Sequence, residues 1–187
     1  ALALGGITDG VTNLEMTAAY ATIANQGTYT RPVFYSQVID SNGRVLLDNT
    51  TPTTHTVLKA STASLLTQGM TSVITEGTGT SAKLDGKMPV SGKTGTTSSE
   101  YDLWFCGYTP YLTASIWTGY DENVSLSGDQ AYHERLWAKI MNQIDSVKKY
   151  KAKSFKMSKD VKKYDICSSS GKVAIKGVCP TSKSEYF

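Results

Sequence analysis

The amino-acid sequence predicts an α+β fold in which helices flank an antiparallel sheet. Three segments have the apolar spacing of helices, three strand-like runs follow one another closely, and Asn42-Gly43 is a strong hairpin signal. Because the order is helix, hairpin, helix, three-strand meander, helix, a doubly wound parallel sheet is not expected.

The first predicted helix covers residues 11–26. Thr12 or Asn13 can cap its start, and Gly27 is a natural C-terminal stop because glycine adopts the left-handed conformation that ends many helices. Two short runs joined by the Asn-Gly turn then form a predicted hairpin: 33–40 and 44–48.

A polar, Thr-rich linker at 49–56 is expected to lead into a second helix at 59–75, whose apolar face comprises Leu65, Leu66, Met70, Val73 and Ile74. Residues 77–86 have the composition of a loop. Three strands follow, and the tight turn Tyr108-Thr-Pro-Tyr111 makes the last two antiparallel: 88–97, 103–109 and 112–120. A final helix is predicted over 129–147, with Leu136, Ile140 and Ile144 on one side and Trp137 and Met141 beside them.

The composition is that of a globular protein with an unusual end. The 187 residues are 40% hydrophobic and carry a net charge of only +3, which gives no electrostatic reason to expect nucleic acid as a partner. The opening ALALGG lacks a basic region and is too short to cross a bilayer. Lysines crowd residues 148–163. We therefore expect a folded part over 1–147 and a Lys-rich linker with a cysteine-bracketed tail over 148–187.

Cys167 and Cys179 bracket a turn-rich segment, and a disulfide between them is the first interpretation, with free thiols as the alternative. A metal site would need more cysteine or histidine than the sequence offers, so no metal or other cofactor is expected. Cys106 lies in an aromatic run and is expected to be a small buried residue.

Residues 90–97 contain Gly-Lys-Thr, which occurs in two unrelated kinds of site. A phosphate-binding loop needs another glycine five positions before Gly92, but Lys87 stands there. The loop must also open a helix, and Gly95-Thr-Thr is a poor helix start. The other interpretation is the Lys-Thr-Gly strand of serine acyl-transferases.

In such a strand each residue has a physical role. Lys93 places a cation near the substrate carboxylate and the proton-transfer network, and Gly95 lets the substrate backbone approach closely. Hydroxyls of Thr94, Thr96 and Thr97 are expected to bind the substrate, and a backbone N–H just past the glycine can help to hold the developing oxyanion. Lys93, Thr94, Gly95 and Thr96 are thus the candidate catalytic residues.

The surrounding text, VSGKTGTTSSEYDLWFCGYTPYLTASIWTGYD, resembles the bifunctional, class A penicillin-binding proteins. In that family a KTGTT strand precedes a D-x-WF-x-GYTP strand and a third that ends W-x-GYD. The opening ALALGGITDGVTNLEMTAAYATIANQGTYTRP and the Cys-Ser-Gly-Cys tail are also similar to members. The matching residues are Asp102, Trp104, Phe105, Gly107, Tyr108, Thr109, Pro110, Trp117, Gly119, Tyr120 and Asp121.

The resemblance implies the C-terminal half of a penicillin-binding/β-lactamase-like transpeptidase domain. The parent would be a membrane-anchored D,D-transpeptidase on the outer face of a bacterial cytoplasmic membrane. Its partners would be peptidoglycan stem peptides, β-lactams and the upstream half of the domain. A DD-peptidase or β-lactamase of the same superfamily, or a non-catalytic cell-wall binding module, is the alternative.

The nucleophile that the reaction needs is not evident in this chain. Ser169 and Lys172 satisfy the Ser-x-x-Lys pattern, but they follow the Lys-Thr-Gly strand and lie in the turn-rich tail, so we interpret them as a coincidence. The serine and its Ser-x-Asn partner are expected upstream of Ala1, and the chain alone is expected to be inactive. Four aromatic residues are assigned to core and turns, and both histidines to the surface or linkers: Tyr108, Trp104, Trp117 and Tyr120; His55 and His133.

Overall fold

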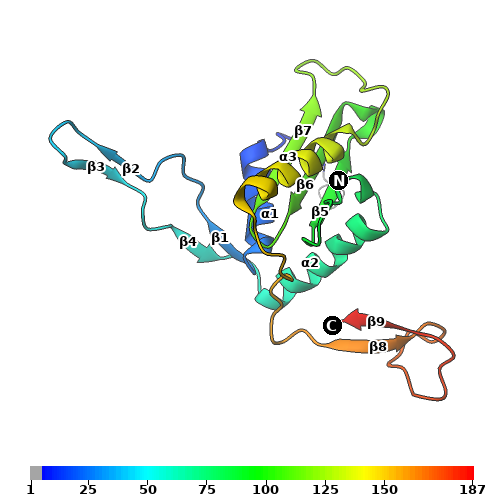
Figure 1. Cartoon of the computed structure of the whole chain (residues 1–187). Coiled ribbons are helices and arrows are strands. Elements are labelled where there is room, and N and C mark those ends of the chain that lie inside the picture. Colours follow the sequence, from blue (N-terminus) through cyan, green and yellow to red (C-terminus); the bar gives the residue numbers. More distant parts are fainter. Residues whose placement is uncertain (1–5) are drawn as a thin grey trace.

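The computed structural model describes residues 6–187, so the first five residues of the apolar opening lie outside the described part of the chain. At its centre is an antiparallel sheet of three strands in the order β5–β6–β7 (Figure 1). Its strands are β5 (Ser91–Thr96), β6 (Asp102–Tyr108) and β7 (Thr113–Gly119). The predicted meander is confirmed, and the strand that carries Lys93 lies at the sheet edge.

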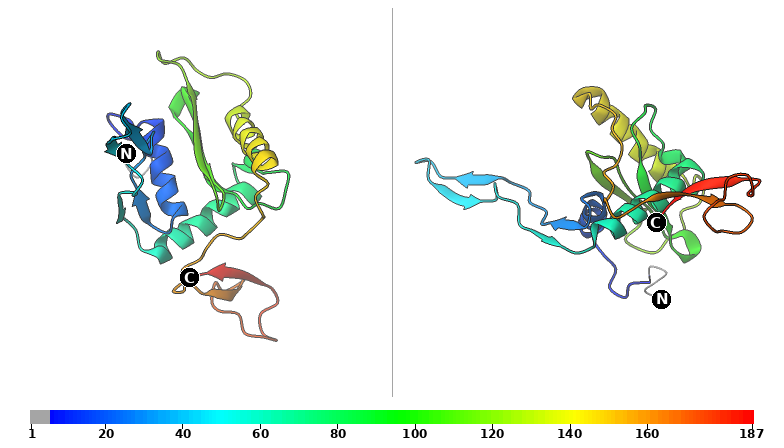
Figure 2. Two further views of the ribbon diagram at one scale, coloured as in Figure 1. Left: turned by 60° about the vertical axis from the view of Figure 1, so that its left-hand side comes forward. Right: turned by 90° about the horizontal axis from the view of Figure 1, so that it is seen from below.

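Helices cover both faces of this sheet. Figure 2 shows α1 (Asn13–Ala24) on one face and α3 (Tyr132–Lys148) on the other. Helix α2 (Ala60–Thr75) packs along β5 and closes one end of the sandwich. The α+β expectation is therefore confirmed, with each of the three predicted helices within a few residues of its predicted bounds. No helix among residues 6–187 is both long and apolar enough to span a membrane.

Local signals set the ends of α1. The Thr12 side chain accepts a hydrogen bond from the Glu15 N–H (3.2 Å), and the Glu15 carboxylate accepts one from the Thr12 N–H (2.8 Å). This reciprocal capping satisfies N–H groups that a helix start leaves unpaired. Gly27 has φ +88°, and a Cβ there would lie 2.1 Å from the Leu58 carbonyl oxygen. Only glycine lets the chain leave α1 so close to the start of α2.

Helix α2 buries small polar side chains rather than the leucines expected on its apolar face. Leu65 and Leu66 are 39% and 42% exposed, whereas Thr67 is buried. The Thr67 hydroxyl lies 2.8 Å from the Tyr108 hydroxyl, and the Ser91 hydroxyl donates to the Thr67 carbonyl oxygen at 2.9 Å. Ile74 of the expected face is buried in the core, but Leu65 and Leu66 are not. The neighbouring strands present hydroxyl groups, and a small helix face at Thr67 allows them to approach and pair.

The apolar core lies between the sheet and α3. Phe105 and Trp137 are almost fully buried and meet edge to face, with ring centroids 5.2 Å apart. The Trp137 indole N–H donates to the Ala114 carbonyl oxygen at 3.0 Å, which satisfies the one polar group of that side chain. Met141 is also buried, but Ile140 is 42% exposed, so the inward face of α3 is rotated from the expected one.

Two titratable residues at the start of α3 are also buried. His133 is 2% exposed and Glu134 4%, which contradicts the expectation that His133 lies at the surface. Burial lowers the pKa of His133 and raises the pKa of Glu134, because each charged form would lose its hydration. His55, by contrast, is exposed, as expected.

Between α1 and α2 the chain extends outward as a two-part ribbon (Figure 1). The predicted hairpin forms its tip, and a second strand pair, which the sequence did not indicate, forms its base. That base includes part of the segment expected to be a polar linker. The bounds are β1 (Thr28–Thr30) paired with β4 (Thr54–Thr56), and β2 (Gln37–Ile39) paired with β3 (Val45–Asp48).

The Lys-rich segment after α3 is extended and packs against the folded part. Tyr150 stacks on Tyr111 with ring centroids 4.4 Å apart, and the Tyr111 hydroxyl donates to the Lys151 carbonyl oxygen at 2.8 Å. The Lys153 ammonium lies 3.8 Å from the centroid of the Tyr111 ring. Beyond it, the tail forms an antiparallel hairpin that the sequence did not reveal: β8 (Lys163–Cys167) and β9 (Ser182–Tyr186).

Candidate functional site

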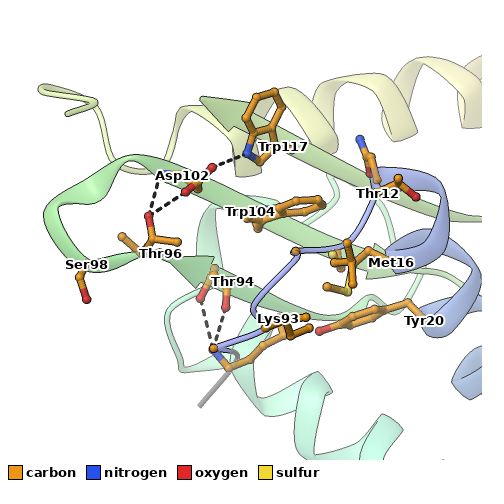
Figure 3. A pocket seen from close by; sticks show the side chains of 18 residues that line it. Thr12, Met16, Tyr20, Lys93, Thr94, Thr96, Ser98, Asp102, Trp104 and Trp117 are labelled. Atoms are coloured by element: carbon orange, nitrogen blue, oxygen red, sulfur yellow. Dashed lines mark hydrogen bonds between the residues drawn. The ribbon is translucent and has the colours of Figure 1, made fainter. Parts of the chain in front are cut away.

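A groove of about 990 Å³ runs between the start of α1 and the face of the sheet at β5 and β6. Every residue from Lys93 to Ser98 lines it, together with residues of β6 and β7. Figure 3 shows Thr12, Met16 and Tyr20 of α1 forming the opposite wall. The groove therefore lies along the strand that carries Lys93, Thr94, Gly95 and Thr96.

Strand alternation divides these residues between two faces. Lys93 and Gly95 face the groove, opposite their cross-strand partners Cys106 and Trp104. Thr94 alternates to the other face, where its hydroxyl oxygen lies 2.7 Å from that of Thr78. The Thr94 hydroxyl is thus at the rim of the groove and already has one hydrogen-bond partner.

The Lys93 ammonium is exposed and donates to the Thr94 carbonyl oxygen at 3.0 Å, with the Thr94 hydroxyl at 3.5 Å. Within residues 6–187 it forms no ion pair with a carboxylate. A cation that is held by neutral oxygens and faces an open groove can accept an anionic group of a ligand. This is the chemistry expected of Lys93.

Two titratable groups on the groove wall do not ionise at neutral pH. Burial raises the pKa of the Cys106 thiol to about 12 and that of the Tyr20 phenol to about 12. Both remain protonated at neutral pH, and a protonated thiol is a poor nucleophile. Cys106 is 3% exposed, which confirms that it is a small buried residue.

A hydrogen-bonded group closes the far end of the groove. The Asp102 carboxylate accepts from the Trp117 indole N–H (2.8 Å) and from the Thr97 hydroxyl (3.0 Å). The Thr97 hydroxyl oxygen in turn accepts from the Asp102 N–H at 2.9 Å. The expected substrate-binding hydroxyl of Thr97 is therefore engaged in joining β5 to β6.

Two weaker motif matches lack the structural context that they require. Gly92-Lys-Thr is in the middle of a β-strand and opens no helix, so the geometry of a phosphate-binding loop is absent there. Ser169 and Lys172 are exposed in the loop between β8 and β9, in a tail that Figure 2 shows apart from the sheet. Neither residue lines the groove.

Cys167 and Cys179 come together across the tail loop. They are free thiols in this structure, and the hydrogen bond between them, with others from Ser170 and Ser169, lowers the pKa of Cys167 to about 7. The disulfide between them stays a prediction. In the part of the chain from Gly6 onward, no cluster of histidine, cysteine and carboxylate side chains could hold a metal ion.

Sequence reasoning missed the aromatic floor of the groove. Trp104 and Trp117 were assigned to the core and turns, yet both line the cavity, and Trp117 is 39% exposed. Part of this arrangement could be predicted, because strand alternation places Gly95 on the same face of the sheet as Lys93. The register that places Trp104 beneath Gly95 could not be read from the sequence.

The chain is similar to known proteins over most of its length. Residues 1–144 match the family described as the penicillin binding protein transpeptidase domain. Penicillin-binding protein 1A of Clostridium acetobutylicum is 40% identical over 141 residues, which are 75% of this chain and 17% of that protein. The chain thus spans less than a fifth of that curated relative.

Solved structures show the same fold. PonA1 from Mycobacterium tuberculosis in complex with penicillin V is 27% identical, with a TM-score of 0.66 over 77% of this chain and 40% of that chain. Penicillin-binding protein 1A from Haemophilus influenzae, at 20% identity, has a TM-score of 0.73 over 95% of this chain and 32% of that chain. The second likeness concerns the fold alone and extends into the tail.

Proposed function

The chain belongs to the penicillin-binding protein transpeptidase family, as part of a class A transpeptidase domain, and we propose that its parent protein is a serine-type D,D-transpeptidase. The observation that carries the proposal is the open groove along the edge strand β5, with the Lys93 ammonium free of any ion pair with residues 6–187. The reaction would cross-link peptidoglycan stem peptides, with the nucleophile supplied from outside this chain.

The reaction has two steps. The serine oxygen attacks the penultimate carbonyl of a D-Ala-D-Ala donor, an ester forms, and the terminal D-alanine leaves with the serine proton on its nitrogen. An amine of a second stem peptide then attacks the ester, the C–N bond forms as the C–O bond breaks, and one amine proton returns to the serine oxygen. Catalysis requires groups that bind charge where it develops.

This chain would supply the carboxylate and oxyanion side of that site. Lys93 would bind the terminal carboxylate of the donor and hold a proton-transfer partner of the serine. Thr94 and Thr96 would contribute hydroxyls, and Thr97 would do so only by releasing its hydrogen bond to Asp102. Gly95 would let the donor backbone lie along β5. Support comes from the position of β5 at the sheet edge, where backbone groups are available to an extended peptide.

β-Lactams would acylate the same serine as substrate mimics. The likeness to PonA1, whose structure contains penicillin V, supports this extension. The relatives are penicillin-binding proteins, which favours an extracytoplasmic site of action and a membrane-anchored parent. We also propose that the transpeptidase part of the chain covers 1–147 and that 148–187 form an appended linker and tail.

The experiment compares Lys93→Ala with Lys87→Ala in the full-length parent protein. Lys87 is an exposed lysine of the loop before β5 and does not line the groove. A charge-assisted hydrogen bond is worth about 1.5–3 kcal/mol, so acylation by a fluorescent penicillin should slow roughly 10- to 100-fold in Lys93→Ala. Equal acylation rates in the two variants would contradict the role of Lys93.

The chain by itself provides a second measurement. Residues 1–187, incubated with the same fluorescent penicillin, should form no covalent adduct, because the acylated serine lies elsewhere. A labelled band that disappears in Ser169→Ala would show instead that the Ser169–Lys172 pair is a working nucleophile and base.

A further inference from the structure

Past Gly95, the sheet side of the groove is formed by the indole rings of Trp104 and Trp117, which we call the indole floor. Trp104 is the cross-strand partner of both Gly95 and Trp117, so the two indoles are neighbours on the groove face of the sheet (Figure 3). A Cβ at position 95 would lie 3.2 Å from the Trp104 Cβ. The absence of that atom leaves Trp104 open to the groove.

Asp102 stands at the end of this floor with its charge uncompensated. Its two known side-chain donors, the Trp117 indole and the Thr97 hydroxyl, are both neutral. No lysine or arginine in the described chain forms an ion pair with it. A carboxylate oxygen can accept two hydrogen bonds, so each oxygen retains capacity for a further donor.

The charges of the groove are separated along its length. Lys93 pairs with Cys106, and Asp102 lies four residues further along β6, which is about 13 Å at 3.3 Å per residue. Lys93 and Asp102 are the only charged residues among those that line the groove in the described part of the chain. The groove thus has a cationic end, an aromatic middle and an anionic end.

We propose that Trp104, Trp117 and Asp102 bind the amino group of the acceptor peptide. The inference rests on the proposed transpeptidation, which requires a primary amine as the second substrate. A protonated amine is attracted to the face of an indole and to a carboxylate. Lys93 repels the same cation, so the acceptor would enter the groove from the Asp102 end. Only the neutral amine can attack the ester, and the proton that the ammonium loses first would pass to the Asp102 carboxylate.

The test uses the full-length parent and separates the two half-reactions. Acylation by fluorescent penicillin reports the donor step. Partition of a synthetic D-Ala-D-Ala donor between hydrolysis and aminolysis, over a range of concentrations of a stem peptide with a free side-chain amine, reports the acceptor step. The variants are Asp102→Asn, which keeps the shape and an acceptor for Trp117, and Trp104→Leu.

Each variant should raise the acceptor concentration for half-maximal aminolysis about tenfold, at least five times more than it slows acylation. Asp102→Glu should restore part of the loss. Asp121→Asn removes a charge of the same region outside the groove and should match wild type.

Equal losses in both steps, together with a lowered melting temperature, would assign Asp102 to the framework only and overturn the proposal. An unchanged aminolysis ratio in both variants would also overturn it. A wild-type parent that does not react with penicillin would instead contradict the proposed function itself.

Discussion

Replacement by alanine should have different effects at two glycines of the edge strand: Gly92→Ala should lower stability, and Gly95→Ala should impair ligand binding. A Cβ at Gly92 would lie 2.7 Å from the Cys106 carbonyl oxygen and 2.9 Å from the Gly107 Cα. Both contacts are with backbone atoms of the paired strand, which cannot move without disturbing the sheet. A Cβ at Gly95 would have one close neighbour, the Trp104 Cβ at 3.2 Å.

The expected magnitudes follow from these contacts. Overpacking against fixed atoms costs about 1–3 kcal/mol, whereas replacing a strand glycine by alanine gains about 0.5–1 kcal/mol. Gly92→Ala should therefore lose roughly 1–2 kcal/mol of stability, and Gly95→Ala should lie near zero. The Gly95 methyl group, however, would point into the groove and cover Trp104, so it should impair ligand binding.

The assay measures thermal unfolding and fluorescent penicillin acylation in the parent protein. Gly92→Ala should lower the melting temperature by several degrees, since about 1 kcal/mol corresponds to roughly 2–4 °C in a domain of this size. Gly95→Ala should melt near wild type but acylate at least tenfold more slowly. Equal melting temperatures for the two variants, or wild-type acylation by Gly95→Ala, would refute the reasoning.

Three further predictions concern the rest of the chain. Under reducing conditions the rate at which Cys167 is alkylated should rise through pH 7, because its pKa is about 7. Mild oxidation should join it to Cys179 with a mass loss of two hydrogens, and alkylation of both thiols after oxidation would contradict the pairing. In Tyr111→Ala, trypsin should cleave the Lys-rich linker about tenfold faster, because a stacked aromatic pair contributes about 0.5–1.5 kcal/mol beyond its buried area. An unchanged cleavage rate would show that the contact with Tyr150 is not needed to hold the linker. Burial lowers the pKa of His133, so the unfolded chain takes up a proton near pH 6.5 and the folded chain does not. The free energy of unfolding should therefore fall as the pH drops below 6.5, and urea unfolding of His133→Gln should show a smaller fall. Equal slopes of unfolding free energy against pH in the two proteins would exclude this cause.

The central sheet was predictable because its signals are local. Alternating strand residues, the Tyr108–Tyr111 turn and the helix stop at Gly27 each act within a few positions, and the structure reproduces them. The base of the ribbon escaped prediction because β1 and β4 pair across more than twenty residues and contain mostly threonines. No periodic apolar pattern marks such a pair.

The inward faces of helices were less predictable because they depend on what each helix meets. Leu65 and Leu66 looked like the buried side of α2, but the strands beside it offer the hydroxyls of Tyr108 and Ser91. His133 looked like a surface residue, and the packing of α3 against the sheet buries it. The hydrophobicity of a helix face does not by itself determine which residues pack against that face.

The sequence by itself determined the family, the edge strand with Lys93 and Gly95, and the fact that two further catalytic motifs are not evident here. Those conclusions depend on residue type and order, which a motif preserves. Only the tertiary structure decided that Thr94 and Thr97 already have hydrogen-bond partners and that Trp104 lies beneath Gly95. Strand register and helix docking bring together residues far apart in the chain, and these depend on the whole packed arrangement rather than on any local pattern.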